Sequence, residues 1–297
     1  MSATTLSVAL VTRNRPRSLE RCLESWRRQT VAPDEIVVSD DSDAGAAVET
    51  EQIALRYGCR YTRGPRRGLY ANRNHASLAC RGAHILSADD DHTHPIDYVA
   101  VVRVLIASDP QRVWIFSERW PGDAESPLVC PPELHRSGFG SPPADPSRCA
   151  AIADGASVYP REIFDSGLRY DETYPFGGLW YLWGKLLANR GWRITFSDRT
   201  FVWHHFWPDD TMPAAGRLDD AVQLKQQLLA TTYVQFVGAL WLDRSPVRVG
   251  WAAAYTLRRV VMPNSIVHFR VRTRLPIVGT ARAVWLAIRA RRAYAAA

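Results

Sequence analysis

Short apolar runs alternate with amphipathic segments over the first two thirds of the chain. Residues 6–11, 36–38 and 113–116 form apolar runs of the length expected for buried strands. Between the first two runs, Leu19 and Leu23 recur at helical spacing with charged residues on the opposite face. Similar patterns predict strands at 57–61, 83–87, 193–196 and 201–203, and helices within 71–82, 96–106 and 179–187. The alternation predicts an α/β fold with a mostly parallel central sheet and helices on both faces.

Acidic residues follow two of these expected strands. Asp40 and Asp41 come after the second run, and Asp89-Asp90-Asp91 comes after the run at 83–87. Ligands bind beyond the carboxyl ends of parallel strands, so we expect these side chains to meet in one crevice. Adjacent carboxylates repel one another, and a hard divalent cation with oxygen ligands would neutralise them. A solvated acidic turn is the alternative interpretation.

The pattern changes twice along the chain. Residues 118–150 are rich in Pro, Gly and Ser and have little periodicity, which is typical of a functional or irregular loop. Beyond about residue 217 the pattern is helical, and Pro246, Pro263 and Pro276 divide the later part into short pieces. We therefore expect an α/β domain at 1–216, which contains the irregular loop 118–150, and a helical extension at 217–297.

Composition and charge refine this picture. The five Cys form no C-x-x-C pair, so neither a zinc site nor a disulfide framework is indicated. The start of the chain has no signal-sequence pattern, and no apolar run reaches the length of a membrane span, which predicts a cytoplasmic protein. The net charge is +7, yet the eleven Arg from Arg244 onward, without any Asp or Glu, give that tail +11 and leave −4 for residues 1–243.

A basic tail predicts an acidic partner surface, either lipid headgroups or nucleic acid. The last helical piece places Val278, Trp285 and Ile288 on one side and Arg282 and Arg289 on the other, which is typical of a helix lying on an anionic membrane. We therefore expect peripheral contact with the inner face of the membrane and no nucleic acid. A basic helix packed on the catalytic domain, with its Arg side chains solvated, is the alternative.

The motifs in this order resemble family 2 glycosyltransferases with the GT-A fold. The opening segment runs from Val11-Thr12-Arg13-Asn14-Arg15 to Ser39-Asp40-Asp41. Matching motifs follow at Asn72-Arg73-Asn74, Asp89-Asp90-Asp91, Asp154-Gly155-Ala156, Arg161, Tyr170-Asp171-Glu172, Arg190-Gly191-Trp192 and Val202-Trp203-His204-His205. The resemblance covers roughly residues 5–206, and it is closest to bacterial, rhamnosyltransferase-like members of envelope polysaccharide type.

The resemblance implies a role for each donor-side residue. In the family, the end of the first strand and the acidic pair after the second strand hold the nucleobase, an Arg faces the nucleotide, and further aspartates hold the ribose and a Mg²⁺ or Mn²⁺ ion. A late His sometimes completes the metal site. Carried over, these roles fall on Thr12, Arg13, Asp40, Asp41, Arg73 and Asp89 for the donor nucleotide, and on Asp90, Asp91 and His204 for the metal. Asn72 stands where the family usually has Ala.

The acceptor side departs from the family pattern. Inverting members carry a carboxylate near the start of the helix that follows the Asp-Glu segment, where it acts as general base. Here that place is occupied by Gly178-Leu179-Trp180-Tyr181, which has no carboxylate. Asp154 is our first candidate for the base, because it precedes the small Gly155-Ala156 pair. Glu172 is the second.

These observations predict a metal-dependent glycosyltransferase of the hexosyltransferase class, inverting at the anomeric carbon. It would transfer a sugar from a nucleotide-diphosphate sugar to a glycan or lipid-linked acceptor in bacterial envelope or exopolysaccharide synthesis. A sugar nucleotidylyltransferase would need a Gly-rich phosphate loop after the first strand, which Thr12-Arg13-Asn14-Arg15 does not supply. A dinucleotide oxidoreductase would need G-x-G-x-x-G, which is also missing there. A non-catalytic relative that binds a nucleotide sugar is the alternative that the missing carboxylate leaves open.

Overall fold

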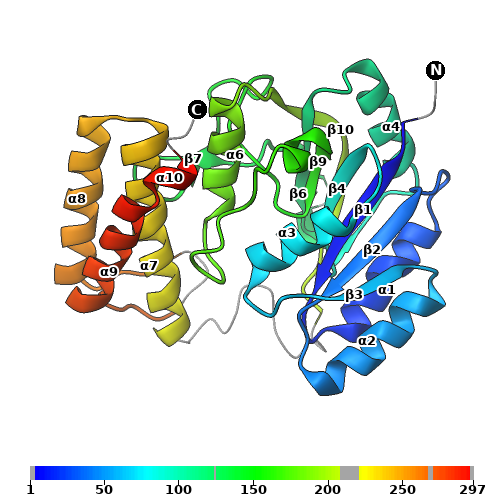
Figure 1. Ribbon diagram of the computed structural model, residues 1–297, viewed down its shortest axis with the longest axis horizontal. Coiled ribbons are helices and arrows are strands. Elements are labelled where there is room, and N and C mark those ends of the chain that lie inside the picture. Colours follow the sequence, from blue (N-terminus) through cyan, green and yellow to red (C-terminus); the bar gives the residue numbers. More distant parts are fainter. Residues whose placement is uncertain (1–3, 124, 208–220, 267–269, 295–297) are drawn as a thin grey trace.

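The computed structural model describes residues 4–123, 125–207, 221–266 and 270–294. Its central sheet has eight strands in the order β3-β2-β1-β4-β9-β6-β10-β5 (Figure 1). The strands span β1 (Leu6–Thr12), β2 (Glu35–Asp40), β3 (Arg60–Arg63), β4 (His84–Asp89), β5 (His92–Thr93), β6 (Val113–Arg119), β9 (Ala156–Pro160) and β10 (Ile194–His204). All pairs are parallel except those of β9 with β4 and β6 and of β5 with β10. The mostly parallel sheet confirms the expected architecture.

Helices cover both faces of this sheet because alternate strand residues point to opposite sides. In β1, Val8 and Leu10 face a cluster built from α1 (Pro16–Arg27), α2 (Ala44–Arg56) and α4 (Tyr98–Ser108). Ala9 and Val11 face the other cluster, which contains residues of α3 (Leu69–Ala79), α5 (Glu162–Asp165) and α6 (Trp180–Asn189). The sheet, and with it the carboxyl ends of β1, β2 and β4, is therefore held between two apolar layers.

The segment 118–150 contains little regular structure. After a short 3-10 helix at Pro121–Asp123, it forms a two-stranded hairpin of β7 (Glu133–Leu134) and β8 (Gly140–Ser141). Cys130 and Cys149, which lie on either side of the hairpin, are buried in the same cluster as α6. All five Cys are free thiols, in agreement with the sequence.

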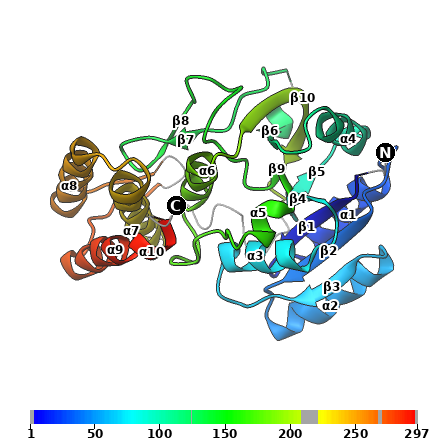
Figure 2. The ribbon, with the colours of Figure 1, turned by 45° about the horizontal axis from the view of Figure 1, so that its top comes forward.

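The C-terminal helices stack against α6 on the side away from α1 and α2 (Figure 2). They are α7 (Ala221–Val237), a π-helical turn at Gly238–Leu242, α8 (Pro246–Val261), α9 (Ile277–Arg289) and α10 (Arg291–Tyr294). Val234 and Val237 of α7 join the apolar cluster of α6, so these helices share a core with the sheet-bearing part. The expected boundary at residue 216 lies outside the described residues.

Two tyrosines tie this helical part to the sheet-bearing part. Tyr233 Oη and Tyr294 Oη both donate to Asp171 Oδ2, at 2.6 and 2.5 Å. Both phenols are buried, so the shared carboxylate is enclosed by the C-terminal helices. In the part of the chain that the structure describes, no helix is long and apolar enough to cross a membrane.

The outer helices differ from the expected arrangement of the tail. The side of α9 that packs inward carries Thr280, Ala283 and Ala287, while Val278 and Trp285 are exposed. Arg289 lies over the Trp285 ring at 4.6 Å, so a basic residue adjoins the apolar residues and is not opposite them. The helix thus packs on the protein through small residues and presents apolar and basic side chains together to solvent.

Candidate active site

The strand ends bring the predicted donor residues together. Thr12 pairs with Asp40 across β1 and β2, and Val11 pairs with Asp89 across β1 and β4. Thr12 Oγ1 donates to Asp90 Oδ2 at 2.6 Å. Parallel pairing has therefore placed the acidic groups of two strands at one edge of the sheet, where the sequence predicted a crevice.

The acidic pair after β2 is already held by protein groups. Asp40 is fully buried and accepts hydrogen bonds from Tyr61 Oη and Arg63 Nη1, both at 2.9 Å. Burial raises the pKa of Asp41, although the Arg66 N–H donates to its Oδ1 at 2.8 Å. Arg13 is exposed at the same edge. Both carboxylates are thus fixed in position beside the end of β1.

Arg73 is a buried cation between two carboxylates. Its Nη2 donates to Asp89 Oδ1 and Oδ2 at 2.8 and 2.9 Å, and its Nε lies 3.0 Å from Asp154 Oδ1. Nη1 donates to Ser87 Oγ at 3.0 Å, and Ser87 Oγ in turn donates to the Asp154 carbonyl at 2.6 Å. Arg73, Asp89 and Asp154, which come from α3, β4 and the loop before β9, therefore form one ionic unit.

Asp154 is a buried carboxyl group whose pKa is shifted towards neutrality. Burial raises its pKa from the ordinary value of 3.8 to about 7, against the opposing effect of Arg73. Gly155 makes its position possible, because a Cβ there would lie 2.5 Å from Asp89 Oδ2 and 2.6 Å from His92 Cε1. A carboxyl group with a pKa near neutrality is suited to proton transfer.

Glu172, the second candidate for the base, has a different environment. Its Oε1 accepts a hydrogen bond from Asn74 Nδ2 at 2.8 Å, and its Oε2 pairs with Arg67 at 2.9 Å. Leu179, at the place of the family's carboxylate, is fully buried at the start of α6. The packing at that place is apolar, and Glu172 is engaged with α3 and the loop before it.

Asp90 and Asp91 are the most deeply buried carboxylates of the triplet. Arg15 pairs with both: its Nε donates to Asp90 Oδ2 at 3.2 Å and its Nη1 to Asp91 Oδ2 at 2.7 Å. Burial raises the pKa of Asp90, whereas Arg15 and His204 hold the pKa of Asp91 well below its usual range against the effect of burial. Sequence reasoning assigned no role to Arg15.

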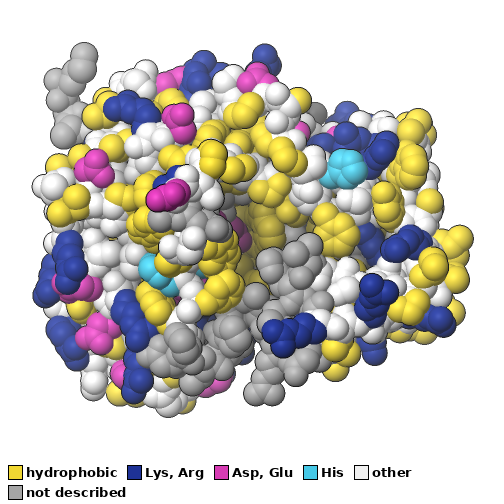
Figure 3. Space-filling model, turned by 180° about the vertical axis from the view of Figure 1, so that it is seen from behind, with side chains coloured by type: hydrophobic (Ala, Val, Ile, Leu, Met, Phe, Trp, Pro, Cys, Tyr) yellow, Lys and Arg dark blue, Asp and Glu magenta, His cyan; other side chains and the backbone are white. Residues whose placement is uncertain are grey.

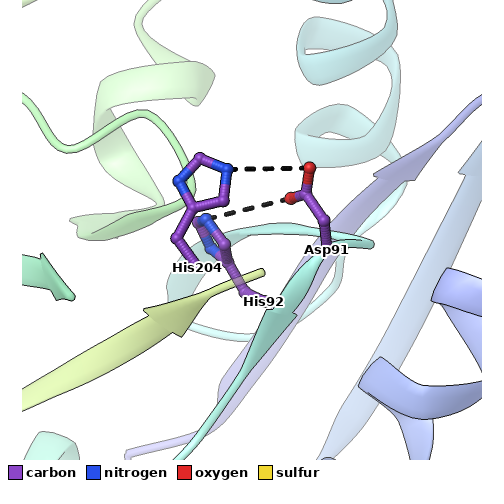
Figure 4. A group of neighbouring side chains, drawn as sticks. All are labelled: Asp91, His92 and His204. Carbon is purple, nitrogen blue, oxygen red and sulfur yellow. Dashed lines mark ion pairs between the residues drawn. The ribbon is translucent and has the colours of Figure 1, made fainter. Parts of the chain in front are cut away.

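Asp91 faces two histidines (Figure 4). His204 Nε2 lies 3.7 Å from Asp91 Oδ2, and His92 Nε2 lies 3.9 Å from Asp91 Oδ1. One ligand atom from each of the three residues lies within 4.8 Å of the others. The Nε2 atoms of both histidines are buried without a hydrogen-bond partner in the part of the structure that is described. Two imidazoles suit a divalent transition-metal ion, and a carboxylate oxygen is a ligand that Mn²⁺ accepts.

His204 is held by a second carboxylate that the sequence analysis missed. Its Nδ1 lies 3.2 Å from Glu118 Oε2, at the end of β6. Burial alone would lower the pKa of His204, but Asp91 and Glu118 together raise it to about 10. A carboxylate behind a histidine orients the ring for metal binding. The position of Glu118 just after the apolar run 113–116 was the available signal, since it matches the positions of the other strand-end acids.

An aromatic pair covers the open side of His204. The Trp120 ring stacks on His204 with a centroid distance of 4.3 Å and on Phe206 with one of 4.6 Å.

The three residues predicted to bind the metal do not all lie together. Asp91 and His204 lie together with His92, whereas Asp90 is turned to Thr12 and Arg15.

Known proteins resemble both the sequence and the fold. Residues 7–128 match the family model described as glycosyl transferase family 2. Among solved structures, GalNAc-T7 with UDP, GalNAc and Mn²⁺ is similar with a TM-score of 0.62 and 18% identity, over 82% of this chain and 50% of that one. The chain thus spans half the length of that protein. None of the curated proteins matches the chain.

A second similar fold is that of S. aureus TarS. TarS 1–349 in complex with UDP-GlcNAc has a TM-score of 0.59 and 14% identity, over 86% of this chain and 72% of that one. The complex of the same fragment with UDP has a TM-score of 0.58 and 15% identity, over 87% and 72%. The mostly parallel sheet and these likenesses show that the chain has a GT-A fold, and its residues 7–128 are similar to glycosyl transferase family 2.

Proposed function

We propose that the chain transfers a sugar from a nucleotide-diphosphate sugar to a glycan or lipid-linked acceptor, with help from Mg²⁺ or Mn²⁺. The observation that carries this proposal is the group of Asp91, His92 and His204 beside the Arg73–Asp89 pair. Asp91 and the two histidines would hold the ion, which stabilises negative charge on the departing diphosphate as a Lewis acid. Asp89 is assigned to the ribose, and Thr12, Arg13, Asp40 and Asp41 to the base.

The acceptor step needs a group that removes a proton. We assign it to Asp154, which in its ionised form takes the proton from the acceptor hydroxyl as that oxygen bonds to the anomeric carbon. The bond between that carbon and the diphosphate oxygen breaks, and its electron pair leaves with the nucleoside diphosphate. Attack from the face opposite the leaving group gives inversion. Arg73 keeps enough of Asp154 ionised near neutral pH for this role.

Donor binding is tested by calorimetric titration with UDP, GDP and dTDP, each with and without Mn²⁺. UDP is the first probe because GalNAc-T7 and TarS were solved with it. We expect one nucleotide to bind in a metal-dependent way and Asp91→Asn to abolish that dependence. Binding of none of the three, or equal binding without metal, would contradict the proposal. Asp243→Asn is the control, because the Asp243 carboxylate pairs with Lys185 of α6 and with Arg248 of α8.

The base assignment is tested by measuring transfer with the nucleotide sugar that the titration identifies. Asp154→Asn should lower the transfer rate by about 10²–10⁴-fold, the usual contribution of a general base. Its nucleotide affinity should stay within a fewfold of wild type. Full transfer by Asp154→Asn together with loss of transfer by Glu172→Gln would move the role to Glu172.

An anionic membrane surface is the partner that we propose for the C-terminal helices. On α8, Val247, Leu257 and Val261 are exposed, and on α9 Val278 is 81% exposed. Figure 3 shows the protein from behind, and basic and hydrophobic side chains are interspersed over its right-hand part, where these helices lie. Such a surface suits lipid headgroups, and it would bring the site to a lipid-linked acceptor in bacterial envelope or exopolysaccharide synthesis.

Sedimentation with liposomes tests this surface. The full chain should pellet with vesicles containing phosphatidylglycerol, and much less with phosphatidylcholine vesicles or at high salt. Trp285→Ala combined with Leu257→Ala should reduce pelleting, whereas Leu55→Ala on α2, which is equally apolar and exposed, should not. Equal pelleting of wild type and the double variant would show that these helices do not bind the membrane.

A further inference from the structure

The loop between β1 and α1 directs the Arg15 side chain into the acidic cluster. Asn14 adopts a left-handed conformation with φ of 56°, and its N–H donates to Ser42 Oγ at 2.6 Å. Its side-chain amide exchanges hydrogen bonds with Asp43, at 2.9 and 2.8 Å. Pro16 then begins α1. The backbone on either side of Arg15 is therefore fixed, and the side chain starts from a defined point.

The guanidinium of Arg15 spans the two most buried carboxylates of the site. Nε and Nη2 pair with Asp90, and Nη1 donates to Asp91 at 2.7 Å. Asp90 and Asp91 have side-chain exposures of 0% and 4%, so their charges need a partner inside the protein. Arg15 thus supplies positive charge at the place where the sequence predicts a metal ion.

The atom that Arg15 contacts is also the atom that a metal would need. Nη1 donates to Asp91 Oδ2, and the same Oδ2 lies 3.7 Å from His204 Nε2. An ion held between Asp91 and His204 would bind this oxygen and stand next to the guanidinium. Two cations so close together repel strongly in a buried site.

We propose that Arg15 is an internal counterion that competes with the divalent cation for Asp91 Oδ2. This inference rests on the proposed function, because it assumes that Asp91 and His204 hold the ion. Arg15 occupies the oxygen in the metal-free site and leaves it when the ion binds. It is a positioning residue whose contact with Asp91 keeps the affinity for free metal low.

The two buried arginines of the site differ in a way that fits this exchange. Arg73 is enclosed, with 2% of its side chain exposed, and its polar partners are Ser87, Asp89 and Asp154. The Arg15 side chain is 15% exposed and begins in a surface loop, so it can turn outward without unpacking the core. Asp90 also accepts a hydrogen bond from Thr12 Oγ1, a contact that does not involve Arg15.

The test measures Mn²⁺ alone binding to the metal-free full chain, by calorimetry or by the electron paramagnetic resonance signal of free Mn²⁺. We compare wild type with Arg15→Gln, Arg15→Lys and the control Arg28→Gln, which removes an equal charge from an exposed side chain just after the other end of α1. Competition predicts that Arg15→Gln binds Mn²⁺ at least tenfold more tightly than wild type, with Arg15→Lys in between and Arg28→Gln unchanged.

A structural role for Arg15 predicts the opposite sign, because a disturbed site binds metal more weakly. Equal or weaker Mn²⁺ binding by Arg15→Gln, with binding by wild type intact, would overturn the inference and leave the metal site standing. Absence of Mn²⁺ binding from every variant, with and without UDP, would overturn the metal site itself. Should Arg15→Gln fail to fold, as judged by circular dichroism, Arg15→Lys decides alone: tighter binding than wild type supports competition, and equal or weaker binding refutes it.

Discussion

The buried Arg73 offers a sharp test of the electrostatics of the site. Arg73→Met keeps most of the side-chain volume and removes the charge that Asp89 and Asp154 share. Removing one partner of a buried ion pair costs about 3–5 kcal/mol. The side chains of Asp89 and Asp154 are 20% and 17% exposed, so solvent screens part of this cost. We therefore expect the free energy of unfolding to fall by about 3 kcal/mol at pH 8.

The size of this loss should depend on pH. The folded-state pKa of Asp154, about 7, lies above its ordinary value of 3.8, so its protonated form contributes stability that is lost as the pH rises through 7. Without Arg73 the folded-state pKa of Asp154 rises further, and the penalty for ionising the group grows. At pH 5 Asp154 is protonated in both proteins, and only the contacts with Asp89 and Ser87 are missing, so we expect a loss of about 1–2 kcal/mol.

Urea unfolding at pH 5.0, 6.5 and 8.0, followed by tryptophan fluorescence, measures these free energies. Arg56→Met is the control, since Arg56 pairs with Glu20 at the surface and its loss should cost less than about 1 kcal/mol at any of these pH values. A loss below about 1 kcal/mol for Arg73→Met at pH 8, or a loss that does not grow with pH, would refute the coupling between Arg73 and Asp154.

Three further substitutions probe other parts of the site. Gly155→Ala should weaken UDP binding at least tenfold in calorimetry, because the Cβ of the new Ala would lie 2.5 Å from Asp89 Oδ2. An unchanged affinity would contradict this packing. Glu118→Gln should lower the pKa of His204 from about 10 by at least one unit in an NMR titration of the metal-free protein, and an unmoved titration would show that Glu118 does not hold the ring. Tyr294→Phe should cost about 1–2 kcal/mol in urea unfolding, and a neutral result would mean that α10 is not anchored by its phenol.

The sheet was predictable where strands are apolar and continuous. The expected strand at 6–11 is β1 (Leu6–Thr12), and the one at 113–116 is the start of β6 (Val113–Arg119). The expected strands at 193–196 and 201–203 form one strand, β10, whose pairing with β6 shifts register between Phe196 and Phe201. β9 was not predicted, since five residues inserted antiparallel between β4 and β6 leave no periodic signal in the sequence.

The acidic side of the site was predictable for a simple reason. Parallel strands end at one edge, so acids at the ends of such strands must gather there, as Asp40 and Asp89 do on either side of β1. The cations that neutralise these acids follow no such rule. Arg15 reaches Asp90 across a separation of 75 residues in the chain, and the contact depends on the left-handed Asn14 before it. Side-chain reach from a loop is set by local backbone geometry, which the hydrophobic pattern does not encode.

The site is therefore organised as two arginines, each shared by two carboxylates. Arg73 links Asp89 to Asp154 and is itself buried, so a charge that is held in place opposes the rise that burial causes in the pKa of Asp154. Arg15 links Asp90 to Asp91 from a loop and can be displaced. A fixed cation suits a group that must keep one pKa through the reaction, and a displaceable cation suits a carboxylate that must accept a metal ion only when the substrate is being loaded. This division of roles would let the chain keep its acidic groups together at one edge of the sheet and remain folded before a donor binds.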